Sequence, residues 1–324
     1  MPRSEKPAQM QSTNNVLGMN IDGERILLVY ASLTGLVYER LVVPTPNRES
    51  FEAILELITV QADKLLNLTK AQHLPVPDQL SVAISGNYDN DTGILGSASD
   101  FPNWKAVPLR SQLALRFNLP VFIEQKANAG ALAEYYFGSA QNIRNLVFVS
   151  MSPRLRVGIL TDGKLYCNSG GTSGQIGNFP LVAGDPTGLG SPVFLDEYVN
   201  SHGLLELAKI RHPNHWEQNI DLMQIIQDAH SGDPFAREIF QEAGERLGGG
   251  LTCLTTLLRP EMIIVGYPGC LIDDYFLAPA RVVLAQIANL DESQLPKLLP
   301  SQLCSRLPEL EALAPVVHAA RNRS

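Results

Sequence analysis

Cysteine is scarce in this sequence. Among its 324 residues there are four, Cys167, Cys253, Cys270 and Cys304, and no two of them form a Cys-x-x-Cys arrangement. This scatter argues against the disulfide framework of a secreted protein and against a zinc knuckle. We therefore predict buried, unpaired thiols in a reducing compartment.

Long hydrophobic runs are also absent. No stretch reaches the roughly 20 apolar residues that a membrane-spanning helix needs. Residues 1–15 are polar and lack the apolar centre of a secretory signal, so they predict a disordered tail. From these absences we expect a cytoplasmic protein without membrane contact.

An excess of positive charge is absent as well. Lysine and arginine number 25 and aspartate and glutamate 33, which leaves a net charge of −8 at pH 7. Such a surface repels a polyanion, so it argues against nonspecific binding of nucleic acid. The 45% of hydrophobic and 18% of charged residues are typical of a globular protein, and the length predicts two lobes.

The first part of the chain has the pattern of an α/β lobe. It predicts three strands joined by tight turns, a helix, and then a strand, a helix and a strand. In chain order these elements are residues 16–21, 26–31, 36–43, 50–68, 80–85, 107–117 and 120–123.

A similar order begins again in the second part. Strands are predicted at residues 145–151, 155–160, 165–166 and 261–265, and a long helix at 234–258, which Pro260 ends. We infer two related lobes, residues 16–123 and 124–305, with a cleft between them. A helix near 308–320 is a candidate to pack back on the first lobe, and Pro315 predicts a kink or split in it.

Residues 80–140 carry several motifs in a specific order: Ser81-Val-Ala-Ile-Ser-Gly86, Ser99-Asp-Phe-Pro-Asn-Trp104, Leu119-Pro-Val121 and Glu124-Gln-Lys-Ala-Asn-Ala-Gly-Ala-Leu-Ala-Glu134. This run resembles that of the ROK family (repressors, open reading frames and kinases). The family has a Gly-Pro-Val-Asp turn, Asn-Leu-Pro-x-Trp, Leu-Pro-Val and Glu-Asn-Asp-Ala-Asn at these places. Later motifs continue the likeness to about residue 320.

The resemblance implies an α/β protein with the two-lobed actin-like ATPase (ribonuclease H-like) fold and a central inter-lobe cleft. Members of the family bind a sugar between the lobes, and the kinases bind ATP beside it. Phosphoryl transfer there needs a base for the hydroxyl, donors around the phosphates and contacts to the sugar.

The position of the family's general base, an aspartate, is Lys126 here. An ammonium group donates hydrogen bonds and accepts none, so it cannot take a proton unless burial removes its charge. Loss of a general base typically slows a reaction roughly 100- to 10,000-fold. We expect Lys126 to form an ion pair with Glu124, Glu134 or another nearby acid.

The first phosphate turn of the family is also altered. Asp22, Gly23 and Glu24 stand in place of Gly-Gly-Thr, so two carboxylates occupy the place that phosphate oxygens would approach. An ordinary Asp-Gly hairpin turn explains the same residues.

The expected second glycine-rich loop reads Ser152-Pro-Arg-Leu-Arg-Val-Gly158, where proline lacks an N–H and bulky residues block the backbone. Arg154 and Arg156 could bind an anion such as a sugar phosphate, but we favour a solvated surface pair. Gly249 and Gly266 complete the set of former nucleotide loops. We therefore expect no ATP.

The family's zinc-binding histidine is replaced by Asn178, and residues 184–192 contain no cysteine or histidine, so we expect no zinc. The family's sugar contacts are replaced by other polar residues, and Asn103 is a further candidate. The resulting set of candidates is Asp100, Asn103, Gln125, Lys126, Gln175, Asn178 and Asp196. These residues suit a cleft that binds a ligand and equally a vestigial cleft filled with water.

Three functions are compatible with these features. The first is a non-catalytic, regulatory protein that senses a sugar or sugar phosphate, related to ROK transcriptional regulators. Only about fifteen residues precede the first strand, too few for a winged-helix domain, so we expect no direct DNA binding. The second is an ATP-dependent hexose kinase with displaced residues, with Asp22, Glu24 or Asp100 as its acid. The third is a dimeric interaction scaffold. We expect a homodimer.

Overall fold

The structure is a computed structural model, and it describes residues 14–168, 170–181, 193–217, 219–288 and 290–322. The strands are β1 (Asn15–Ile21), β2 (Arg25–Ser32), β3 (Val37–Pro44), β4 (Gln79–Ile84), β5 (Tyr88–Asp89), β6 (Ile94–Leu95), β7 (Val121–Gln125), β8 (Leu146–Ser150), β9 (Arg156–Thr161), β10 (Lys164–Leu165), β11 (Pro180–Leu181), β12 (Val193–Phe194), β13 (Met262–Val265) and β14 (Lys297–Pro300).

The α-helices are α1 (Phe51–Ala71), α2 (Leu109–Phe117), α3 (Lys126–Phe137), α4 (Asp196–Val199), α5 (Ser201–Arg211), α6 (Leu222–Ser231), α7 (Pro234–Leu258), α8 (Ala278–Ile287) and α9 (Leu307–Arg321). Short 3-10 and π turns lie between several of them. Residue 15 belongs to β1, so this strand begins one residue earlier than predicted, and residues 1–13 of the predicted tail lie outside the described residues.

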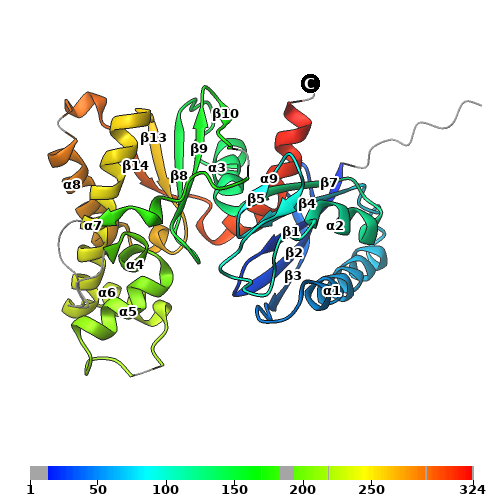
Figure 1. Cartoon of the computed structure of the whole chain (residues 1–324), viewed down its shortest axis with the longest axis horizontal. Coiled ribbons are helices and arrows are strands. Elements are labelled where there is room, and N and C mark those ends of the chain that lie inside the picture. The colour runs from blue at the N-terminus through cyan, green and yellow to red at the C-terminus, as the bar shows by residue number, and fades with distance from the viewer. Residues whose placement is uncertain (1–13, 169, 182–192, 218, 289, 323–324) are drawn as a thin grey trace, which may run out of the picture.

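The described residues form two five-stranded sheets with the same topology. The first has the order β3-β2-β1-β4-β7 and the second β10-β9-β8-β13-β14. In each sheet the first three strands pair antiparallel and the next two add in parallel. Each sheet belongs to one lobe (Figure 1). The structure thus has two lobes of one design, as the repeated strand pattern predicted.

Helices cover the outer face of each sheet. The side chain of Ser50 caps α1 by accepting a hydrogen bond from the backbone N–H of Ala53, and α1 buries Ile54, Ile58 and Leu65 against the first sheet. On the second lobe α7 begins after the capping side chain of Asp233. It spans the residues that the sequence predicted.

Helices α3 and α9 form a layer between the two sheets (Figure 1). Their buried side chains share one hydrophobic cluster with residues of both sheets, for example Val29 of β2, Phe148 of β8, Leu132 of α3 and Leu313 of α9. Because this core is common to both lobes, it sets how the two sheets face each other. The carboxyl ends of the parallel strands, with the polar residues that follow them, line the cleft between the lobes.

The last helix continues through Pro315, so the predicted kink or split of α9 is wrong. A proline inside a helix lacks an N–H and crowds the preceding turn. The hydroxyl of Ser81 on β4 accepts a hydrogen bond from the N–H of Val316 at 3.3 Å. Burial of nearly the whole helix against β1 and β4 further stabilises it.

The prediction of four unpaired thiols is also wrong. Cys270 and Cys304 form a disulfide, with their Cα atoms 6.0 Å apart. Of the free cysteines, Cys167 is exposed and Cys253 is half-buried. The disulfide joins the segment after β13 to the turn before α9, and only the fold brings these two segments together.

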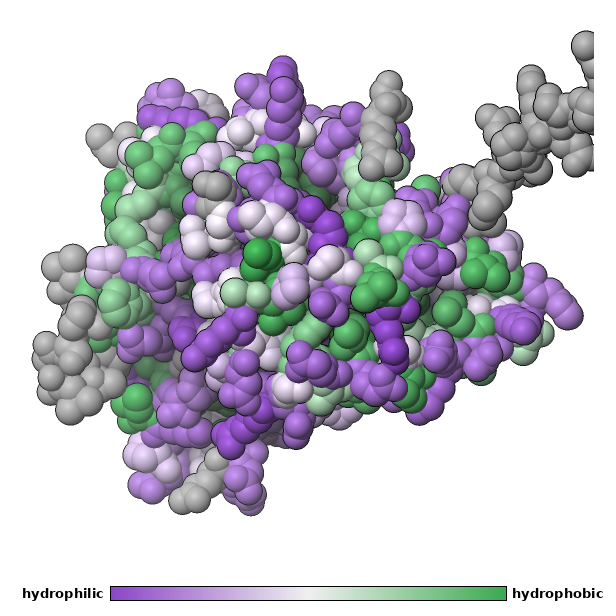
Figure 2. Space-filling model, turned by 45° about the vertical axis from the view of Figure 1, so that its right-hand side comes forward, coloured by the Kyte–Doolittle hydropathy of each residue, from purple (hydrophilic) through white to green (hydrophobic). Residues whose placement is uncertain are grey.

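No helix among the described residues is long and apolar enough to cross a membrane. On the face that Figure 2 shows, hydrophobic residues lie in small separate groups among hydrophilic ones.

Two glycines allow α3 to lie close to the second sheet. A methyl group added at Gly130 of α3 would lie 2.2 Å from the ring of Phe148. At Gly158 of β9 it would lie 2.1 Å from the backbone carbonyl oxygen of Ala127. Neither distance is possible for real atoms, so glycine is required at both positions for this packing.

We predict that Gly158→Ala lowers the free energy of unfolding by about 1–3 kcal/mol or more, because the methyl group forces α3 away from β9. A matched control is Gly249→Ala in α7, where the added methyl group meets no described atom within 4 Å apart from its chain neighbours and the backbone of its own helix. There we expect no loss, and a gain of up to about 1 kcal/mol. Urea unfolding measures both, and equal stability of the two variants would contradict the packing described.

Candidate functional site

A cleft lies at the carboxyl ends of the parallel strands of both sheets, the usual position of ligand sites in α/β proteins. It consists of three adjoining pockets, whose empty volumes with open solvent included are about 390, 310 and 590 Å³. We call them the α9 pocket, the central pocket and the open pocket.

The three pockets share residues and so form one continuous cleft. The α9 pocket is lined by Asp22, Glu24, Arg25, Lys126, Phe148, Ser150, Ser152, Gly266, Tyr267, Leu307, Pro308 and Glu311. The central pocket is lined by Ser85, Gly86, Ser99, Asp100, Gln125, Lys126, Ala127, Ser150, Ser152, Pro153, Arg154 and Arg156. The open pocket is lined by Asn87, Ser97, Ser99, Arg154, Leu155, Arg156, Gln175, Gly177, Asn178 and Asp196.

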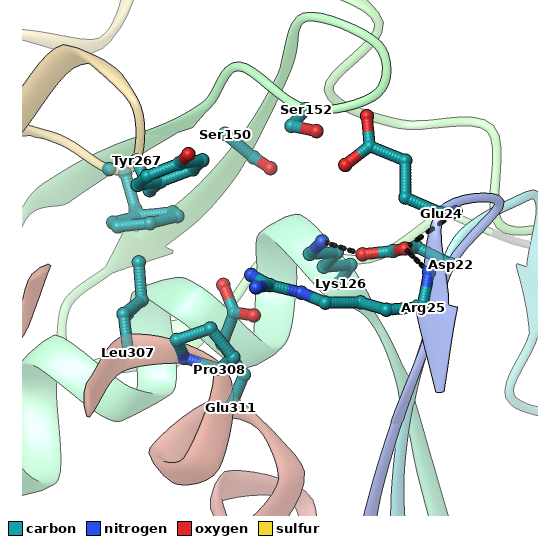
Figure 3. A pocket seen from close by; sticks show the side chains of 12 residues that line it. Asp22, Glu24, Arg25, Lys126, Ser150, Ser152, Tyr267, Leu307, Pro308 and Glu311 are labelled. Atoms are coloured by element: carbon teal, nitrogen blue, oxygen red, sulfur yellow. Dashed lines mark hydrogen bonds and ion pairs between the residues drawn. The ribbon is translucent and has the colours of Figure 1, made fainter. Parts of the chain in front are cut away.

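Lys126, the first residue of α3, forms a buried ion pair with Asp22. Its Nζ lies 2.5 Å from Oδ2 of Asp22, and the two side chains are 12% and 5% exposed. The other oxygen of Asp22 accepts hydrogen bonds from the backbone N–H groups of Glu24, at 3.0 Å, and Arg25, at 2.9 Å (Figure 3). The turn after β1 is therefore held to the start of α3.

The two acids named in the sequence analysis are not the partners of Lys126. Glu124 accepts hydrogen bonds from the side chains of Asn90 and Asn128. Glu134 accepts from the backbone and hydroxyl of Ser139. Because successive residues after β7 point in different directions, Lys126 meets an acid that lies 104 positions earlier in the chain.

The charges of this pair stabilise each other. Burial opposes ionisation of Lys126, but the carboxylates of Asp22 and Glu311 outweigh it and raise the pKa of the ammonium group. Burial also opposes ionisation of Asp22, yet Lys126 and the backbone N–H groups hold its pKa below the usual range. Both groups remain charged at neutral pH, so Lys126 has no free electron pair with which to accept a proton.

Glu311 of α9 was not found by the sequence analysis. It is 2% exposed and lines the α9 pocket, and Nδ2 of Asn20 donates to its Oε2 at 2.6 Å. Burial raises its pKa to about 7, although Lys126 partly opposes this. In Figure 3 the side chain of Arg25 extends toward it. No local motif marks Glu311, because only the return of α9 to the first lobe brings it here.

The arginines after β8 are not the solvated surface pair that the sequence favoured. Nη1 of Arg154 lies 2.6 Å from Oδ2 of the buried Asp196, whose Oδ1 accepts from the N–H of Leu155. Arg156 is half-buried and donates to Oδ1 of Asn87 at 2.8 Å. Both line the central and open pockets, because the chain turns here from β8 back into β9.

The remaining sugar-site candidates divide between two pockets. Asp100 and Gln125 line the central pocket, and Oδ2 of Asp100 accepts from the N–H of Gly23 at 3.3 Å. Gln175 and Asn178 line the open pocket and are joined by a hydrogen bond of 2.9 Å. Burial, together with the carboxylate of Asp22, raises the pKa of Asp100.

Two of the candidates lie elsewhere. Asn103 is exposed and donates to the backbone carbonyl of Arg48. Gly249 lies within α7, and neither residue lines the three pockets. Gly266 lines the α9 pocket.

The absence of zinc and of ATP remains a prediction. Among the described residues no group of three or more His, Cys, Asp or Glu is placed to hold a metal ion. Asn178 donates to Gln175, and the predicted zinc-free loop at 184–192 lies outside the described residues. Around the first turn Asp22 and Glu24 present carboxylates to the α9 pocket, which disfavours phosphates there.

The raised pKa of Glu311 makes stability depend on pH. The folded state binds a proton at about pH 7, whereas an exposed glutamate binds one near pH 4.3, so stability rises as the pH falls between these values. We predict that Glu311→Gln removes roughly 1–3 kcal/mol of this rise. Unfolding at pH 5.5 and 7.5 measures it, with the exposed Glu52→Gln as control. An unchanged slope in Glu311→Gln would contradict this assignment.

Known proteins are similar to this chain over most of its length. A xylose repressor from Caldicellulosiruptor bescii is 27% identical over 320 residues, which cover 95% of this chain and 79% of the repressor. A glucokinase from Halalkalibacterium halodurans is 23% identical over 279 residues, or 82% of this chain and 83% of that enzyme.

Solved structures share the fold. A ROK family transcriptional regulator, described as a homolog of the E. coli MLC protein, has a TM-score of 0.84 at 21% identity, with 94% of this chain and 78% of that one covered. A ROK family glucokinase from Streptomyces griseus, solved with glucose and AMPPNP, has a TM-score of 0.80 at 24% identity, with 92% and 98% covered. The two-lobed actin-like fold is thereby confirmed. The sequence profile of the ROK family matches residues 16–304, and the chain therefore belongs to the ROK family.

Proposed function

We propose that this protein is a non-catalytic ROK protein that senses a sugar or sugar phosphate in its inter-lobe cleft. The observation that carries this proposal is the ion pair of Lys126 with Asp22, 2.5 Å apart, at the position of the family's catalytic base. An ammonium group whose pKa is raised by its neighbours cannot accept the proton of a sugar hydroxyl.

The neighbouring carboxylates support the same conclusion. Asp22 is engaged by Lys126 and by two backbone N–H groups. Glu311 is buried on α9 and accepts a hydrogen bond from Asn20. Neither is free to reach a hydroxyl in the central pocket, because both belong to the network that closes the α9 pocket.

The proposal includes the absence of zinc and ATP. An asparagine in place of the zinc histidine donates to Gln175, and carboxylates face the place of the phosphates. The net charge of −8 gives no support to contact with nucleic acid. A homodimer remains a prediction.

Binding of a carbohydrate is supported by the lining of the cleft. Its central and open pockets present hydroxyl, amide, carboxyl and guanidinium groups, the partners that sugar hydroxyls use. The relatives include a xylose repressor and a glucokinase solved with glucose. The proposed regulatory role has two supports: the similarity to xylose repressors, and the lysine at the position of the family's catalytic base.

One alternative is an ATP-dependent hexose kinase with displaced residues. Asp100 favours it, because this carboxyl lines the central pocket and has a raised pKa, as a proton acceptor near neutral pH would. Another alternative is a dimeric scaffold with a vestigial cleft, for which a ligand would not change stability.

A panel of hexoses, pentoses and sugar phosphates distinguishes these functions. We expect no ATP consumption, and a higher melting temperature with a subset of the sugars. A ligand at a hundredfold excess over its Kd adds about 2.7 kcal/mol of stability. Turnover at an ordinary kinase rate that Asp100→Asn abolishes would establish the kinase instead. Stability unchanged by every ligand would establish the scaffold.

The structural role of the ion pair gives a further prediction. Lys126→Met leaves Asp22 buried without its cation, so we expect a loss of about 3–5 kcal/mol in the free energy of unfolding. The double variant Asp22→Asn/Lys126→Met removes both charges and should recover most of this loss. Urea unfolding of the wild type, both single variants and the double variant measures the coupling. Additive losses would mean that the two side chains do not interact.

A further inference from the structure

Arg156 is a cation of the cleft, at the junction of the central and open pockets. Among the described residues its guanidinium group forms one hydrogen bond, from Nη2 to the neutral amide oxygen of Asn87, at 2.8 Å. Among the described residues its Nη1 is enclosed and has no hydrogen-bond partner. Across the described residues no carboxylate lies within 4.0 Å of its guanidinium nitrogens, and the charges of Asp100 and Asp196 act on it from farther away. Lys126 and Arg154, by contrast, each contact an aspartate.

An enclosed guanidinium group without an anion is unfavourable, because it loses hydration that nothing replaces. A buried N–H group of this kind normally donates a hydrogen bond to an acceptor. Arg156 lines both the central and the open pocket, so its side chain borders the space that a ligand can enter. The missing partner is therefore one that enters the cleft.

Other donors converge on the same space. Nε2 of Gln125 is buried and has no hydrogen-bond partner among the described residues, although Gln125 is only 4% exposed. The hydroxyl-bearing residues Ser99 and Ser152 line the central pocket beside it. Arg154 adds a second guanidinium group, which Asp196 holds in place. Two guanidinium groups, an amide and hydroxyls together match the acceptor oxygens of a phosphate or carboxylate.

The carboxylates near these donors do not remove this preference. Both oxygens of Asp196 are engaged, one by Arg154 and one by the N–H of Leu155. Asp100 lines the central pocket, and burial and the Asp22 carboxylate raise its pKa, so it takes up a proton more readily when an anion enters. The pair of Lys126 and Asp22 is neutral overall.

We propose that the ligand of the cleft is a carbohydrate that carries an oxyanion, either a phosphate or a carboxylate, bound by Arg154 and Arg156 where the central and open pockets meet. The neutral part of the ligand contacts Asp100, Gln125, Gln175 and Asn178. This inference rests on the proposed sensing function, because it concerns the same cleft. It narrows the ligand from neutral or charged sugars to sugars that carry a negative charge.

Isothermal titration of the full chain tests this with glucose, glucose 6-phosphate, glucuronate and inorganic phosphate. We expect at least one of the two anionic sugars to bind tenfold or more tightly than glucose. Phosphate competes if glucose 6-phosphate is the tighter ligand, and glucuronate identifies a carboxylate site. Arg156→Gln should weaken the anionic sugar at least tenfold more than it weakens glucose, whereas Arg156→Lys should retain part of the affinity for the anionic sugar.

The matched control is Arg116→Gln, which removes the same charge at an exposed ion pair with Glu56 on the first lobe. An equal loss in both variants would reveal nonspecific attraction and overturn the inference. If glucose binds as tightly as glucose 6-phosphate and glucuronate, the protein senses a neutral sugar: the proposed function is then supported and the present inference is wrong. If no sugar binds, the sensing function fails with it. Should Arg156→Gln not fold, the order of the wild-type affinities alone decides.

Discussion

The buried ion pair between Lys126 and Asp22 is the constraint on which the cleft depends. It joins the turn after β1 to the start of α3, and both side chains are almost inaccessible to water. Loss of one partner of such a pair leaves the other charge buried without a counter-ion, so each of the two residues depends on the presence of the other. Glu311, Asn20 and Arg25 surround the pair and complete a network that occupies the place of a phosphate turn.

The hydrophobic layer of α3 and α9 sets the geometry of this network. Because the layer shares one core with both sheets, the carboxyl ends of the strands from the two lobes face one another across a short distance. Gly130 and Gly158 let α3 approach the second sheet, which places Lys126 at the bottom of the cleft. The disulfide between Cys270 and Cys304 joins a wall of the α9 pocket to the start of α9 itself.

The two ends of the cleft differ in charge. At the α9 pocket the acids Asp22, Glu24 and Glu311 face the cations Arg25 and Lys126 of the protein itself, so an incoming phosphate would find no excess of positive charge. At the central and open pockets the donors outnumber their partners, because Arg156 and Gln125 retain atoms without hydrogen bonds among the described residues. The ROK fold is thus retained, and the proposed anion site lies where the family has its second phosphate loop, with arginine side chains in place of glycine backbone N–H groups.

The sequence by itself determined most strands of the two large sheets, the two lobes, the bounds of α7 and the lysine at the base position. These features are local, since apolar spacing, caps and motifs are read within a few residues. It missed α3 to α6, α8 and the sheet strand β14, did not name Asp22 as the acid that pairs with Lys126 and placed both arginines in solvent. Only the tertiary structure decided that Asp22 meets Lys126, that Glu311 returns to Asn20 and that Arg156 reaches Asn87. These contacts join residues 69 to 291 positions apart, and such contacts depend on the path of the whole chain.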